Sequence, residues 1–185
     1  MKMASYRLKL IENLIPSKES KIIEIGCGNG EITDYLHSKG FRKIKATDNN
    51  LIPSKSKPVN FEKKDAFEIN YSKYDVIIAW GVFEYILNLE KFLDKLSRET
   101  KKGVVIIFSV PNVCSLSKRI RVFFGKSPNR EIIPSRVYSF ETIKHAIKQY
   151  FPNYEVFGDN TDSIKNIYFK TPKSMSGQII GIIRK

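Results

Sequence analysis

Apolar and amphipathic segments alternate along most of this 185-residue chain. Several short apolar runs are rich in β-branched residues, which is typical of strands buried inside a sheet. Other segments repeat their apolar residues at the spacing of an amphipathic helix. The predicted strands cover residues 21–26, 43–48, 59–65, 74–80, 104–111, 154–159 and 178–185. The predicted helices cover residues 4–15, 31–40, 89–100, 115–125 and 139–151, and Ser139 is the predicted N-cap of the last one.

The order of these elements predicts an α/β fold. Strands that alternate with helices form βαβ units, which give a mainly parallel sheet with helices on both faces. No helix is predicted between the last two strands, so we expect one of them to be antiparallel. The predicted fold is a doubly wound, mainly parallel seven-stranded sheet with an antiparallel edge hairpin, and residues 1–185 are expected to form one domain. Residues 49–58 contain two prolines and predict no helix.

A glycine-rich turn follows the first predicted strand, in the segment IIEIGCGNGEIT. Gly26, Gly28 and Gly30 let the main chain turn tightly and approach a ligand closely. Dinucleotide sites prefer a third small residue at position 31, where this chain has Glu31, whose charge would repel a pyrophosphate. No Gly-Lys-Ser/Thr follows, which excludes a phosphate-binding loop. The turn therefore suits a ligand without phosphate that carries a cationic amine, to which Glu24 offers a carboxylate.

This segment resembles the first motif of class I S-adenosylmethionine-dependent methyltransferases. Four later segments resemble further elements of the same family in the same order: KIKATDNN, EKKDAF, YDVIIAWGVFEYI and KKGVVIIFSVPN. The resemblance implies a Rossmann-like fold, S-adenosylmethionine as the cofactor and methyl transfer as the reaction. The cofactor-binding residues that it implies are Glu24, Gly26, Cys27, Gly28, Gly30, Asp48, Asn49, Asp65, Ala66, Trp80 and Gly81.

The resemblance also implies which part of the cofactor each motif contacts. Asp48 would accept hydrogen bonds from both ribose hydroxyls, although an acidic residue here would suit a dinucleotide ribose as well. Asp65 would accept a hydrogen bond from the adenine amino group, and the main chain of Ala66 would contact the ring. Trp80 and Gly81 stand where the fourth strand ends, beside the methionine part of the cofactor. The Trp80 side chain is also consistent with a core position.

The reaction demands alignment more than it demands reactive side chains. The sulfonium methyl of the cofactor is already activated, so the enzyme chiefly holds the acceptor behind it. A general base is needed only where the acceptor keeps a proton of high pKa. Position makes Glu84, Tyr85 and His145 the catalytic candidates, and His145 is also consistent with an ordinary exposed histidine. Many relatives have a histidine where this chain has Tyr85, and in some of them a Glu-His pair near this point helps to hold a metal. Because this histidine is missing here, we expect no metal site.

Residues 111–138 look like a lid inserted over the active site. The segment combines many basic residues with aromatic residues and a single acidic one. Its basic residues are Lys118, Arg119, Arg121, Lys126, Arg130 and Arg136, its acidic residue is Glu131, and the aromatic residues are Phe123, Phe124 and Tyr138. Such a lid suits an anionic or amphiphilic acceptor or the stacked bases of RNA, and an ordinary amphipathic lid has the same pattern.

The composition is typical of a globular protein with a basic surface. The net charge of +13 permits RNA or an acidic membrane as a partner, and it is also consistent with a merely well-solvated surface. Cys27 and Cys114 lack the spacing of a disulfide framework or a metal site. No apolar run approaches the roughly 20 residues that cross a bilayer, and the N-terminus does not resemble a signal peptide, so we expect a cytoplasmic protein.

Three functions remain open from the sequence. The first is a methyltransferase that acts on a small or amphiphilic acceptor, with oxygen as the expected acceptor atom. The second is an RNA methyltransferase that uses the basic lid, and the third is a non-catalytic module that binds S-adenosylmethionine. The Asn/Asp-Pro-Pro-aromatic signature of amino-directed nucleic-acid methyltransferases is absent after the fourth strand, where AWGV stands, which favours the first function.

Overall fold

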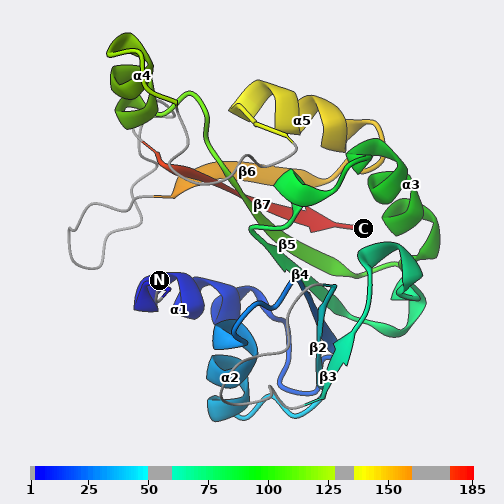
Figure 1. Cartoon of the computed structure of the whole chain (residues 1–185). Helices are drawn as coiled ribbons and strands as arrows, with labels where there is room; N and C mark the ends of the chain where they lie inside the picture. Colours follow the sequence, from blue (N-terminus) through cyan, green and yellow to red (C-terminus); the bar gives the residue numbers. More distant parts are fainter. Residues whose placement is uncertain (1–2, 50–59, 128–135, 160–175) are drawn as a thin grey trace.

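A seven-stranded sheet forms the centre of the computed structural model, which describes residues 3–49, 60–127, 136–159 and 176–185 (Figure 1). The strands are β1 (Ile22–Ile25), β2 (Ile44–Asp48), β3 (Phe61–Lys63), β4 (Val76–Trp80), β5 (Val105–Pro111), β6 (Tyr154–Asp159) and β7 (Gln178–Arg184). They lie in the order β3-β2-β1-β4-β5-β7-β6. Strands β1 to β5 pair in parallel, whereas β7 runs antiparallel to both β5 and β6. The predicted fold class and its antiparallel edge hairpin are confirmed.

The helices cover both faces of the sheet. Figure 1 shows α1 and α2 on one face and α3 and α5 on the other, while α4 stands away from the body. The helices are α1 (Ser5–Leu14), α2 (Glu31–Ser38), α3 (Leu89–Glu99), α4 (Leu116–Phe123) and α5 (Phe140–Lys148). Three short 3-10 helices, which the sequence analysis did not predict, are η1 (Ala66–Glu68), η2 (Tyr71–Lys73) and η3 (Phe83–Tyr85).

Each face of the sheet has its own hydrophobic core. On one face, Phe92 of α3 and Ile143 of α5 are fully buried against the apolar side chains of β4 and β5. On the other face, Ile11 of α1 and Leu36 of α2 pack against the opposite side of the same strands. Because both faces are covered, the central strands read as nearly continuous apolar runs, as parallel strands do.

Side-chain caps fix where two of these helices begin. The Ser139 hydroxyl accepts a hydrogen bond from the Thr142 amide (3.2 Å), and the Thr142 hydroxyl accepts one from the Ser139 amide (2.9 Å). The Asn88 side chain accepts a hydrogen bond from the Lys91 amide (2.9 Å) at the start of α3. Such caps stabilise a helix by about 1 kcal/mol each. The predicted N-cap at Ser139 is therefore confirmed.

The topology places the switch point of the sheet at the carboxyl ends of β1 and β4, which is where doubly wound sheets have their ligand crevice. From β1 the chain moves outward to β2 and β3, and it then returns to β4 on the other side of β1. The connections after β1 and β4 therefore leave in opposite directions, and ligands of doubly wound sheets bind at this switch point. The glycine turn and the Glu84 segment follow these two strands.

Some sequence predictions fall on residues that the structure does not describe. Apart from Asn49, the predicted loop at 49–58 lies outside the described residues, and so do Arg130 and Glu131 of the predicted lid. Among the described helices, none has the length and apolar character that crossing a membrane requires.

Candidate active site

The turn after β1 has one closed side and one open side. Gly26, Gly28 and Gly30 have φ angles of +63°, +51° and +78°, which side-chain-bearing residues rarely adopt. A Cβ added to Gly26 would lie 2.5 Å from Cγ2 of Val82, so the segment after β4 packs directly on the turn. A Cβ added to Gly28 would meet nothing within 4 Å. The main chain is thus bare and accessible at Gly28.

Asp48 at the end of β2 is bonded to this turn. Its Oδ2 atom accepts a hydrogen bond from the Gly28 amide at 3.0 Å, and the residue is only 8% exposed. The Cys27 amide donates to the Thr47 carbonyl (3.0 Å), which holds the turn against β2. Asn49, the next residue, is exposed. The carboxylate that would bind the ribose is therefore held in place by the glycine turn itself.

Glu24 lies beneath the turn in a buried position. Its Oε2 atom accepts a short hydrogen bond from the Thr33 hydroxyl of α2. Burial raises the pKa of Glu24 to about 7, and the Thr33 hydrogen bond opposes the shift. Burial also raises the pKa of the Cys27 thiol to about 12, so this cysteine stays protonated. Thr33 was not anticipated from the sequence, where its only signal is a polar residue on the buried side of a helix.

The Asp65 segment follows β3 and is fixed by a capping box. The Asp65 side chain accepts a hydrogen bond from the Phe67 amide (2.8 Å), while the Glu68 side chain accepts one from the Asp65 amide (3.4 Å). The carbonyl of Ala66 accepts a hydrogen bond from the buried Tyr71 hydroxyl (2.7 Å). Asp65 and Ala66 are half-buried. The segment therefore has a defined conformation beside β2, whose end carries Asp48.

The end of β4 joins the turn to the core. Trp80 is half-buried and packs against the core beneath α1 and α2, which agrees with the core position that was the alternative for this side chain. Gly81 has a φ angle of +68°, and its amide donates to both the carbonyl and the hydroxyl oxygen of Ser109 on β5, each at 3.1 Å. The Gly81 amide is thus occupied by the sheet.

Glu84 is an enclosed carboxyl group on the β4 side of the switch point. It lies on η3, directly after β4, and it is 4% exposed, whereas the adjacent Tyr85 is 60% exposed. Burial raises the pKa of Glu84 to about 7, and the positive charge of Lys118 on α4 acts in the opposite direction. Burial lowers the pKa of Lys118, and the Glu84 charge opposes that shift. The predicted lid therefore brings a cation within electrostatic reach of Glu84.

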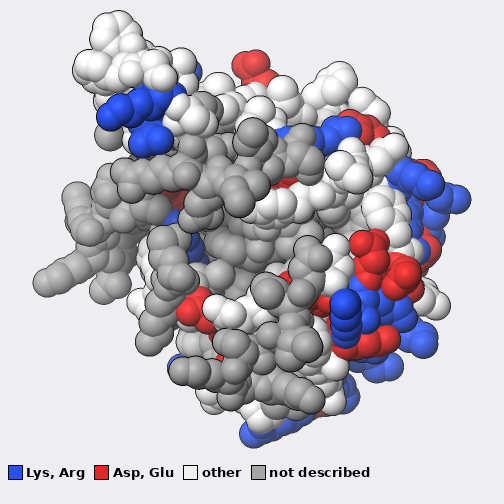
Figure 2. All heavy atoms as spheres, in the orientation of Figure 1, with Lys and Arg blue, Asp and Glu red and all other residues white. Residues whose placement is uncertain are grey.

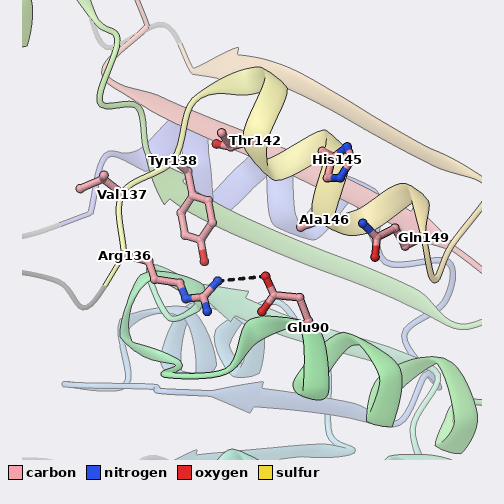
Figure 3. Close-up of a pocket in the computed structure, with 8 residues that line it drawn as sticks. All are labelled: Glu90, Arg136, Val137, Tyr138, Thr142, His145, Ala146 and Gln149. Carbon is pink, nitrogen blue, oxygen red and sulfur yellow. Dashed lines mark hydrogen bonds and ion pairs between the residues drawn. The ribbon is translucent and has the colours of Figure 1, made fainter.

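His145 lies in a hollow between α3 and α5 (Figure 3). The hollow has a volume of about 350 Å³, and Arg136 pairs with Glu90 across it, with Nη1 3.0 Å from Oε1. Its lining residues are Glu90, Arg136, Val137, Tyr138, Thr142, His145, Ala146 and Gln149. None of the predicted cofactor residues lines it. The structure places Glu84 directly after β4, whereas His145 lies in the separate hollow between α3 and α5.

The described residues fit the chemical groups of S-adenosylmethionine. The open main chain at Gly28 leaves room for a flat or extended ligand against the turn. Asp48 presents a fixed carboxylate suited to ribose hydroxyls, and Glu24 offers a buried carboxyl that can become charged beside an amine. The carboxyl groups of Asp48 and Glu24 would repel the phosphate groups of a dinucleotide. The site thus suits a sulfonium nucleoside better than a dinucleotide.

Two curated relatives illustrate the similarity in sequence. Malonyl-[acyl-carrier protein] O-methyltransferase of Calditerrivibrio nitroreducens is 27% identical over 110 residues, which cover 58% of this chain and 45% of that protein. The ubiquinone biosynthesis O-methyltransferase of Rickettsia bellii is 31% identical over 106 residues, which cover 49% of this chain and 42% of that protein. The similarity therefore spans less than half of the length of these relatives.

Solved structures share the fold at lower identity. A SAM-dependent methyltransferase from Archaeoglobus fulgidus superposes with a TM-score of 0.69 at 19% identity, covering 97% of this chain and 92% of that one. Phosphoethanolamine N-methyltransferase 2 of Haemonchus contortus, in complex with S-adenosyl-L-methionine, has a TM-score of 0.62 at 17% identity. The match covers 83% of this chain and 38% of that one. A small RNA methyltransferase has a TM-score of 0.74 at 16% identity, and the match covers 100% of this chain and 26% of that one.

The family follows from a match over most of the chain. The methyltransferase domain family matches residues 2–155, a range that contains the glycine turn, Asp48 and Glu84. The match confirms the resemblance recognised in the sequence motifs. The chain belongs to the methyltransferase domain family.

Proposed function

We propose that this protein transfers the methyl group of S-adenosylmethionine to an oxygen atom of a small or amphiphilic acceptor. We further propose that residues 1–185 act as one catalytic domain, that residues 111–138 form its lid, and that the protein works in the cytoplasm. The observation that carries the proposal is the enclosed Glu84 carboxyl. Its Oε1 atom would lie 3.7 Å from a Cβ added to Gly81, so it stands at the end of β4 beside the switch-point crevice.

The residues around the turn would bind the cofactor, which supplies an activated methyl group. Asp48 would bind the ribose hydroxyls, Glu24 the amine directly or through water, and the bare main chain of Gly28 would allow close approach. Asp65 and Ala66 would lie beside the adenine, with Trp80 and Gly81 at the methionine part.

Glu84 is suited to remove a proton from a hydroxyl acceptor. A carboxyl with a pKa of about 7 is partly ionised at neutral pH and is a stronger base than an ordinary carboxylate. Glu84 would accept the hydroxyl proton of the acceptor, while the cofactor would supply the methyl group and leave as its thioether. With a hydroxyl acceptor, the products would be the methyl ether, S-adenosylhomocysteine and the protonated carboxyl of Glu84. Lys118 would stabilise negative charge on the acceptor during this step.

The curated relatives support an oxygen acceptor. The relatives from Calditerrivibrio nitroreducens and Rickettsia bellii are both named O-methyltransferases, the first for malonyl-[acyl-carrier protein] and the second for ubiquinone biosynthesis. The similarity to each includes less than half of its length, so it supports the reaction class more than a particular acceptor. An amphiphilic acceptor, which joins a polar oxygen group to an apolar part, fits the basic and aromatic residues of the lid.

A labelled-methyl transfer assay tests the proposal. The purified protein is incubated with methyl-labelled S-adenosylmethionine and three acceptors: a phenol with a long apolar chain, a malonyl thioester and a short RNA. We expect label in one of the first two, and we expect S-adenosylhomocysteine but not NAD to raise the melting temperature. Label in RNA alone would establish the RNA methyltransferase instead. Stabilisation by S-adenosylhomocysteine without transfer to any acceptor would identify a non-catalytic binding module.

A further inference from the structure

Helix α4 exposes an apolar surface that no described part of the protein covers. None of its residues is buried. Phe123 is 83% exposed and Phe124 is 69% exposed, and the two rings contact each other edge to face at 5.4 Å between centroids. Isolated helices of this length are marginal in water, and large exposed apolar patches are rare on monomeric proteins. The exposure of these apolar side chains therefore indicates that α4 binds a partner.

Three of the four apolar residues of α4 share one side of the helix, whereas the exposed Val122 lies between Lys118 and Arg119. Leu116, Ile120 and Phe123 recur at helical spacing and form one exposed stripe. The same spacing places Arg119 directly beside this stripe, and Arg121 farther round the helix on its other side. Figure 2 shows Lys and Arg atoms gathered below uncharged atoms at the tip of α4. An apolar stripe with flanking cations is typical of a helix that lies in a membrane interface.

We propose that α4 docks the protein onto an anionic lipid surface. The stripe would enter the boundary between headgroups and acyl chains, while the flanking cations would remain at the level of the headgroup phosphates. Residues 111–127 contain four basic residues and no acidic residue, so the charge of this segment complements an anionic bilayer. Phe123 and Phe124 supply the large apolar area that reversible interfacial binding requires.

RNA and a second copy of this chain fit the same surface less well. RNA would be held by the cations and by stacking rings, but it offers no partner for the aliphatic side chains of Leu116 and Ile120. A second copy would bring a second set of cations, since α4 and the residues beside it carry only positive charge. Only an anionic bilayer satisfies the aliphatic, aromatic and basic groups together.

The opposite side of α4 connects this surface to the crevice. Lys118, on the side away from the stripe, interacts electrostatically with Glu84. Docking would therefore bring the acceptor side of the crevice close to the bilayer, where an amphiphilic acceptor is concentrated. This consequence rests on the proposed function, whereas lipid docking itself does not.

Vesicle co-sedimentation tests the docking. We compare phosphatidylcholine vesicles with vesicles that also contain phosphatidylglycerol, and we expect binding to the anionic vesicles that weakens with salt. Arg119→Gln/Lys126→Gln should lose roughly fivefold in affinity for each cation removed. Phe123→Ser/Phe124→Ser should lose on the order of tenfold or more. The charge-matched control Lys91→Gln/Lys102→Gln, on exposed lysines of α3 and the loop after it, should bind as the unmodified protein does.

Tryptophan fluorescence gives a direct measure of insertion. Phe123→Trp should show a blue shift on anionic vesicles beyond any change from Trp80, the chain's single native tryptophan. Because none of the α4 residues is buried, the melting temperature should be the same in every α4 variant. Equal sedimentation of the Phe123→Ser/Phe124→Ser variant and the unmodified protein would overturn the proposal. So would a lipid-free dimer that this variant abolishes, or RNA binding with no affinity for vesicles. Each of these results can occur with methyl transfer intact, so the two proposals fail separately.

Discussion

The cofactor side and the acceptor side of the crevice are built in different ways. On the cofactor side, the Gly28 amide bonds to Asp48 and the Thr33 hydroxyl bonds to Glu24, and both carboxyl groups are buried. On the acceptor side, Glu84 is enclosed, but the adjacent α4 has no buried residue. Packing thus fixes the geometry that would recognise the cofactor. The acceptor side carries exposed side chains that can change without loss of the fold.

The largest expected effect comes from Glu84→Gln. Removal of the general base should lower kcat roughly a thousandfold, while the affinity for S-adenosylhomocysteine stays the same. Transfer assays and calorimetry measure the two quantities separately. In the unmodified protein, kcat should rise with pH through about 7 as Glu84 ionises, and the variant should lose this rise. A greater loss of kcat in Tyr85→Phe or His145→Gln than in Glu84→Gln would move the base to one of those residues.

Asp48→Ala should have the opposite signature, with a loss of cofactor affinity. We expect a loss of about 3 kcal/mol in the binding of S-adenosylhomocysteine, because charge-assisted hydrogen bonds to the ribose are removed. The variant also frees the Gly28 amide, so Asp48→Asn serves as the control that keeps an acceptor for this amide. Calorimetry should place Asp48→Asn between the unmodified protein and Asp48→Ala. Unchanged affinity in Asp48→Ala would exclude the ribose assignment.

Gly28→Ala tests whether the open side of the turn faces the cofactor. The added methyl group would occupy space that the cofactor needs, so affinity should fall roughly 10- to 100-fold. Gly40→Ala is the matched control, because Gly40 also has a positive φ (+91°) and also has no neighbour within 4 Å of an added Cβ. Both variants share the backbone strain, but only Gly28→Ala should lose S-adenosylhomocysteine in calorimetry. Equal affinities in the two variants would place the cofactor elsewhere.

The parts of the molecule that sequence predicted well are local in the chain. The Ser139 cap depends on Thr142 three residues later, and the glycine turn depends on residues within one short segment. The apolar runs predicted the inner strands β1, β2, β4, β5 and β7 because a sheet covered on both faces buries nearly every residue of these strands, whereas the edge strands β3 and β6 are mostly not buried. Local spacing carries all of this information.

The contacts that sequence did not predict join distant elements. Thr33 meets Glu24 only because α2 packs on β1, and the charge of Lys118 reaches Glu84 only because the fold brings α4 and η3, which are more than 30 residues apart in sequence, near each other. The pKa values of both glutamates follow from burial, which no spacing in the sequence reports. The capping box at Asp65 is local, but it lies in a 3-10 turn too short to show a period.

The smallest expected effect is a pH dependence that separates Glu24 from Glu84. Burial raises the pKa of each to about 7 because it disfavours the charged form. A cationic amine beside Glu24 would favour its charged form, so amine binding below this pKa must release a proton. The release costs about 1.4 kcal/mol for each pH unit below the pKa. Affinity for the cofactor should therefore rise with pH until Glu24 is already ionised.

Calorimetry with S-adenosylhomocysteine at two pH values measures this difference. We expect binding to be roughly tenfold weaker at about pH 6 than at about pH 8, with proton uptake by the buffer at the lower pH. Glu24→Gln should remove the pH dependence, because the amide does not titrate. Glu84→Gln should retain it, because Glu84 belongs to the acceptor side and its ionisation should not respond to the amine. The reverse pattern in these two variants would place the amine beside Glu84 and exchange the two sides of the crevice.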